Sequence, residues 1–131
     1  MIRRSWSTTA AVIWTLAIFL GTWLPRQHIP HPELEGASFF RFLPLDKIVH
    51  TVLFAGFAFL WLLAGRTSPG LLKRVLFFGL LLAILTELGQ ATPWVGRDAE
   101  LNDVFADSLG LLLGVGLYRS QLHRKWLLES D

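Results

Sequence analysis

The sequence contains no cysteine among its 131 residues. This absence excludes disulfide bonds, thiolate metal ligands and a cysteine nucleophile. Charged residues are also scarce, at 17% of the chain against roughly 25% in ordinary soluble domains. The formal net charge of +2 is small, and the chain has no P-loop, dinucleotide fingerprint or nucleic-acid-binding signature. We therefore expect one domain without a nucleic-acid partner.

Apolar residues, by contrast, are abundant: they make up 53% of the chain and include six Trp and ten Phe. They gather in four runs, at residues 8–24, 48–64, 71–88 and 104–118. Each run approaches the roughly 20 residues that a helix needs to cross a bilayer core. Backbone polar groups in lipid must be satisfied within the segment, so we predict that all four runs are helices. The predicted fold class is all-α, a single-domain integral membrane bundle of four transmembrane helices.

The basic residues are divided unevenly between the two ends of these predicted spans. Eight lie at one end (Arg3, Arg4, Arg66, Lys73, Arg74, Arg119, Arg124 and Lys125), and four lie at the other (Arg26, Arg41, Lys47 and Arg97). The richer end marks the cytoplasmic face, so we predict that both termini are inside. No small-x-small cleavage site follows Leu20, and we expect the first run to be retained as a span.

Polar side chains stand at the outer ends of the apolar runs. Asp46 and His50 are spaced i,i+4, and Glu87 and Gln90 are spaced i,i+3. Each pair therefore shares one face of its predicted helix. Ionisable residues that border a membrane span are energetically costly and by default mark a functional site. We interpret these residues as parts of one pocket on the outer face.

The last predicted helix carries a stripe formed by Asp103, Asp107, Gly110 and Gly114. Its lower half is Gly-x-x-x-Gly, a pattern that lets another helix approach closely. The acidic half is therefore expected to face inward, with Arg97 in the preceding loop as its counter-ion. Several carboxylates cannot all stay ionised and unpaired in a low dielectric. We expect that one of them is protonated or that the cluster holds a cation.

Two interpretations of these residues involve no chemistry. Glu87, Arg97 and Asp103 can form an ion-pair network that only locks the helix ends together. Alternatively, the chain is a scaffold that uses Gly110 and Gly114 to bind another membrane protein or a second copy.

Two further interpretations do involve chemistry. In a membrane-embedded enzyme acting on an envelope lipid or phosphoester, His50 would be the base, oriented by Asp46, and Glu87 the acid. A metal site built from His50 and the carboxylates is chemically possible, although no H-x-x-x-H or H-E-x-x-H spacing supports it. The sequence identifies no cofactor.

The polar residues also occur in a distinctive order. The pieces are Asp46-Lys47-Ile48-Val49-His50, Glu87-Leu88-Gly89-Gln90, Gly96-Arg97, the run from Asn102 to Gly110, and Gly114. Taken together, the order D-K-x-x-H, E-x-x-Q, R and D-x-x-x-[ND]-x-x-G resembles the VanZ-like family of small bacterial membrane proteins. The resemblance covers roughly residues 25–114.

This resemblance implies a site and a cellular setting. The implied site residues are Asp46, His50, Glu87, Gln90, Arg97 and Asp103, together with Asp107, where many members carry Asn. The family is named for an accessory protein linked to teicoplanin resistance, which points to the cell envelope and its lipid-linked wall precursors.

We therefore expect a multi-pass protein of the bacterial cytoplasmic (inner) membrane that is a binder rather than an enzyme. Its extracytoplasmic pocket is expected to bind a polar, phosphate-bearing or cationic envelope component, such as an envelope lipid or wall precursor. In this interpretation Arg97 is the anion contact.

Overall fold

The described part of the chain is entirely helical apart from short turns. The structure, a computed structural model, describes residues 2–23, 45–65, 68–95 and 100–129. These residues form α1 (Ile2–Thr22), α2 (Leu45–Ala64), α3 (Leu71–Gln90) and α4 (Leu101–Glu129). The all-α prediction is confirmed for them.

All four helices extend into polar sequence beyond the apolar runs, and α1 begins at Ile2 rather than at residue 8. α2 begins at Leu45 rather than at residue 48, α3 ends at Gln90 rather than at 88, and α4 spans Leu101–Glu129 rather than 104–118. The apolar runs mark where a helix can contact lipid, whereas the backbone hydrogen bonds of a helix continue into its polar ends. As a result the described polar residues of the predicted site lie within helices: Asp46, His50, Glu87, Gln90, Asp103 and Asp107.

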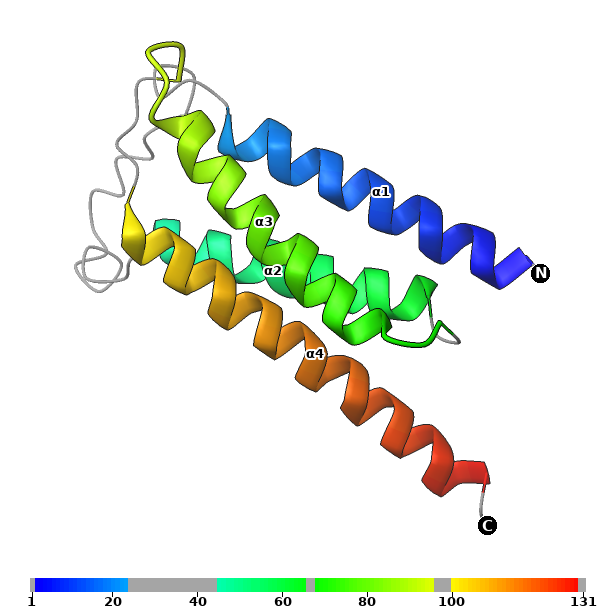
Figure 1. Ribbon diagram of the computed structural model, residues 1–131. Coiled ribbons are helices and arrows are strands. Elements are labelled where there is room, and N and C mark those ends of the chain that lie inside the picture. Colours follow the sequence, from blue (N-terminus) through cyan, green and yellow to red (C-terminus); the bar gives the residue numbers. More distant parts are fainter. Residues whose placement is uncertain (1, 24–44, 66–67, 96–99, 130–131) are drawn as a thin grey trace, which may run out of the picture.

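The helices alternate in direction along the chain (Figure 1). The N- and C-termini lie at the same end of the bundle as the connection between α2 and α3. At the other end, α2 and α4 begin and α3 ends. Because α2 and α4 run parallel, the first turns of both lie at that end. This arrangement gathers polar residues that are far apart in the sequence.

The closest approach between helices is that of α4 to α2, at the glycine stripe. A Cβ atom on Gly110 would collide with the carbonyl oxygen of Thr51, and one on Gly114 with that of Ala55. The Thr51 hydroxyl donates a hydrogen bond of 3.2 Å to the Ala106 carbonyl across the same contact. The helix that packs on the stripe is therefore α2 of the same chain. An outside helix at this stripe would require α2 to move away.

Inside the bundle, away from the polar end, the core is apolar and aromatic. Its buried residues include Ile18, Phe54, Phe57, Leu82 and Leu111. Trp14 of α1 lies over Gly56 and donates its indole N–H to the Leu53 carbonyl at 2.8 Å. This contact fixes α1 against α2 and satisfies the one polar atom of the indole.

The outer surface of the bundle is also apolar. Large hydrophobic side chains are exposed on all four helices, among them Leu20, Val52, Phe77, Leu88 and Leu112. Such extensive apolar exposure is atypical of a soluble monomer and suits contact with lipid. By length and composition, two of the described helices contain candidate membrane spans, Asp46–Ala64 and Leu101–Arg124, and α1 contains a shorter apolar stretch, Trp6–Thr22.

Candidate functional site

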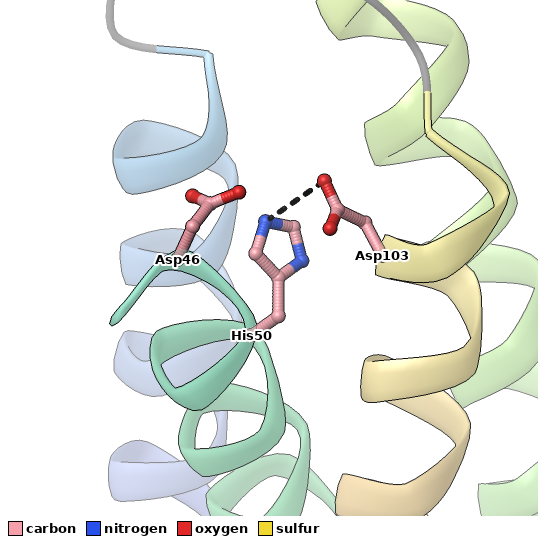
Figure 2. A group of neighbouring side chains, drawn as sticks. All are labelled: Asp46, His50 and Asp103. Atoms are coloured by element: carbon pink, nitrogen blue, oxygen red, sulfur yellow. Dashed lines mark ion pairs between the residues drawn. The ribbon is translucent and has the colours of Figure 1, made fainter. Parts of the chain in front are cut away.

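The polar end of the bundle contains a cluster contributed by three helices. Asp46 and His50 come from the first turns of α2, Asp103 and Asp107 from the first turns of α4, and Glu87 from the last turn of α3. Figure 2 shows the His50 ring between Asp46 on its own helix and Asp103 on α4. All except Asp46 are buried. We call these five residues the polar cluster.

His50 contacts two carboxylates of α4. Its Nδ1 lies 2.9 Å from Oδ1 of Asp107, which is hydrogen-bonding distance. Its Nε2 lies 3.9 Å from Oδ2 of Asp103 (Figure 2). The imidazole of His50 is thus oriented by Asp107 from the opposite helix. The hydrogen-bond partner of Nδ1 is Asp107, whereas the enzyme interpretation assigned the orienting role to Asp46.

Lys47 supplies the positive charge of this site among the described residues. Its Nζ pairs with Asp103 and lies 2.7 Å from Oε2 of Glu100 and 3.7 Å from Oδ2 of Asp46. The ammonium therefore links the start of α2 to the start of α4. From the sequence, Lys47 was predicted as a basic residue of the outer end and as part of the D-K-x-x-H motif, and not as a site residue. Its i,i+4 spacing to Thr51, which faces α4, is the signal that could have identified it.

Arg97, the counter-ion predicted from the sequence, lies outside the described residues. Its proposed contact with the cluster and with an anion stays a prediction.

Several buried polar atoms in this region have no hydrogen-bond partner among the residues that the structure describes. Oε2 of Glu87 accepts a hydrogen bond of 2.9 Å from the backbone N–H of Glu100. In contrast, Oε1 of Glu87, Oδ2 of Asp107 and both polar atoms of the Gln90 amide are unpaired. Gln90 lies one turn beyond Glu87 on α3, on the same face. Buried polar atoms are nearly always paired in native proteins, so unpaired ones call for a partner.

The arrangement brings potential ligand atoms close together. One atom from each of His50, Glu87 and Asp107 lies within 4.8 Å of the others, and the same holds for Asp46, His50 and Asp103. His50 belongs to both sets. The cluster can therefore hold a cation, share protons among carboxylates or bind a polar group that enters from the helix ends.

These features define a helical membrane protein in which the helix ends enclose a cluster of buried ionisable side chains. The family model described as VanZ/LLP1 matches residues 2–124. The chain belongs to the VanZ/LLP1 family and is a VanZ-like membrane protein. Searches of curated proteins and of solved structures found no match to it.

Proposed function

We propose that this VanZ-like protein crosses the bacterial cytoplasmic membrane four times and binds a polar component of the cell envelope at its polar cluster. The observation that carries the proposal is the set of unpaired buried atoms on Glu87, Gln90 and Asp107. Each of these atoms loses its hydration on folding and gains no protein partner among the described residues. A bound polar group would supply the missing hydrogen bonds.

The proposed topology has both termini in the cytoplasm. It is supported by the position of the termini and of the α2–α3 connection at one end of the bundle (Figure 1). Eight of the twelve basic residues of the chain belong to that end, as expected for the cytoplasmic side. The polar cluster then opens toward the extracytoplasmic face, where wall precursors are displayed.

The proposed ligand is the headgroup of an envelope lipid or of a lipid-linked wall precursor. In this proposal Arg97 contacts a phosphate, and the carboxylates accept hydrogen bonds or cationic groups of the same ligand. Occupation of such a headgroup site is the proposed route by which the protein contributes to envelope function or to teicoplanin resistance.

The test is to identify lipids that co-purify with the protein from a bacterial host by mass spectrometry. Arg97→Ala and Asp103→Asn are compared with Asn102→Ala, which changes an exposed neighbour on α4. We expect the wild type and Asn102→Ala to retain a specific phosphate-bearing lipid that Arg97→Ala and Asp103→Asn both lose. Identical lipid profiles in all four proteins, with folding intact, would rule the proposal out.

An enzymatic function is the second candidate, because Asp107 orients the His50 imidazole in the way that a carboxylate supports a general base. Incubating the purified protein with the co-purified lipid distinguishes the two candidates. A product that disappears in His50→Gln indicates catalysis, and unchanged lipid indicates binding alone.

A further inference from the structure

We propose that His50, Glu87 and Asp107 form a binding site for one divalent transition-metal ion, of the Zn²⁺ or Mn²⁺ class. The site lies where α2, α3 and α4 meet, and each helix contributes one ligand. This inference rests on the proposed function, because both take the polar cluster to be a binding site. It adds that a metal ion stays bound there as a permanent part of the protein.

The donor atoms are already close enough to share an ion. One potential ligand atom from each of the three residues lies within 4.8 Å of the other two, so a small adjustment of the side chains would bring all three around one ion. Nδ1 of His50 is 2.9 Å from Oδ1 of Asp107. Two ligands at right angles, each ~2.1 Å from a metal ion, stand roughly 3 Å apart, so this separation matches that of neighbouring ligands in a coordination shell.

Two of the three ligands also have a buried oxygen without a partner. Oε1 of Glu87 and Oδ2 of Asp107 make no hydrogen bond with any described part of the chain, and their residues are 5% and 0% exposed. A carboxylate oxygen in this state has lost its water without gaining a donor. Coordination of a cation satisfies such an oxygen where the surrounding protein provides no N–H or O–H group.

The charges of the described buried residues point to a divalent ion. Three carboxylates of the cluster are buried, those of Glu87, Asp103 and Asp107. Lys47 pairs with Asp103, which leaves Glu87 and Asp107 without a Lys or Arg partner among the described residues, and His50 binds a metal ion only as the neutral imidazole. Two carboxylates and a neutral imidazole carry two negative charges, which one divalent ion balances.

The other set of possible ligands fits less well. Asp46 is half exposed at its side chain, and Asp103 is already engaged by the Lys47 ammonium. Coordination at Asp103 would have to displace that ammonium or place a second cation beside it. The ligand types in the preferred set decide the class of metal, because imidazole favours Zn²⁺ and related ions while two carboxylates also suit Mn²⁺.

The experiment measures metal in the full-length protein, purified in detergent without chelator and without a polyhistidine tag. Elemental analysis of the wild type is expected to find about one equivalent of Zn²⁺ or Mn²⁺ per chain. After removal of the metal with a chelator, calorimetric titration with each ion alone should restore one equivalent. A folded wild type that binds neither ion, or that binds only Ca²⁺ or Mg²⁺, overturns the proposal.

Isosteric variants locate the site. Glu87→Gln and Asp107→Asn each remove the charge of one ligand and keep its shape, and both should weaken binding at least ~10-fold, the lower end of what even an outer-shell change costs. Glu100→Gln is the matched control, because Glu100 is an exposed acid that contacts Lys47 and belongs to neither set of ligands. Wild-type affinity in both ligand variants overturns the proposed site.

The lipid analysis of the same preparations separates this inference from the proposed function. If the wild type is purified without metal, binds neither ion on titration and still retains the headgroup, the cluster binds an envelope component without an ion. The metal proposal then fails while the proposed function is supported. A stoichiometric ion that depends on Glu87 and Asp107, in a protein with no specific lipid, supports the metal site while the proposed function fails.

Discussion

Nδ1 of His50 lies 2.9 Å from Oδ1 of Asp107, and this hydrogen bond joins α2 to α4 inside the bundle. The two residues are 2% and 0% exposed. The contact holds the imidazole with its Nε2 toward Asp103 (Figure 2). It also lies near the hydrogen bond between Thr51 and Ala106, which joins the same two helices. The polar cluster and the α2–α4 interface are therefore parts of one structural unit.

Replacement of Asp107 by Ala and by Asn should separate the hydrogen bond from the charge. Asp107→Ala leaves the His50 ring nitrogen buried without an acceptor and should reduce the free energy of unfolding by about 1–3 kcal/mol. Asp107→Asn keeps a carbonyl acceptor at the same place and should cost clearly less. The measurement is unfolding in detergent, followed by circular dichroism. Equal losses in the two variants would show that the hydrogen bond does not contribute to stability.

Lys47 should be required to keep Asp103 buried as a carboxylate. Lys47→Met keeps the length of the side chain and removes the ammonium, which should cost about 1–3 kcal/mol because a buried acceptor loses its donor. Adding Asp103→Asn removes the unpaired charge and should recover part of that loss.

Glu100→Gln serves as the control for Lys47→Met, since Glu100 is the exposed partner of Lys47. It should change stability by less than about 1 kcal/mol, as expected for a surface pair. A Lys47→Met variant as stable as the wild type would contradict the proposed role of Lys47. Detergent unfolding of the single and double variants provides the comparison.

The glycine stripe predicts opposite effects for the same substitution at two neighbouring positions. A Cβ at Gly114 meets the Ala55 carbonyl of α2, whereas a Cβ at Gly116 meets nothing within 4 Å. Gly114→Ala should therefore destabilise the bundle by about 1–3 kcal/mol through overpacking. Gly116→Ala should be neutral or should stabilise α4 by up to ~1 kcal/mol. Melting temperatures in detergent test this pair, and the reverse order would contradict the α2–α4 packing.

The lack of cysteine allows a direct test of the proposed topology. Ala91→Cys at the end of α3 and Ser120→Cys on the C-terminal part of α4 introduce single exposed thiols into a chain that has none. In intact cells, a membrane-impermeant maleimide should label Ala91→Cys and not Ser120→Cys. Both should be labelled after the membrane is opened. Labelling of Ser120→Cys alone in intact cells would invert the proposed orientation.

Much of the fold followed from the sequence because hydropathy and helical spacing are local properties. The apolar runs identified the four helices, and the i,i+4 and i,i+7 spacing of Asp103, Asp107 and Gly110 placed them on one face, where the structure finds all three buried. The helix ends were less predictable. Hydropathy changes where lipid contact stops, and the helices continue past that point to include Asp46 and Gln90.

The partners within the polar cluster depended on tertiary packing. Spacing indicated that Asp46 and His50 share a face, but the hydrogen-bond partner of His50 Nδ1 is Asp107, which is 57 positions away. Likewise, Lys47 pairs with Asp103 of another helix, a partnership that no local pattern indicates.

By itself, then, the sequence determined which segments are helical, which faces are polar and which side chains collect at one end of the bundle. Only the tertiary structure decided that α2 and α4 lie parallel and touch at Gly110 and Gly114, and therefore which polar groups meet. The physical reason is that periodicity fixes the face on which a side chain stands. Its partner depends on which backbones can approach closely, and here the missing Cβ atoms of two glycines bring Asp107 to His50.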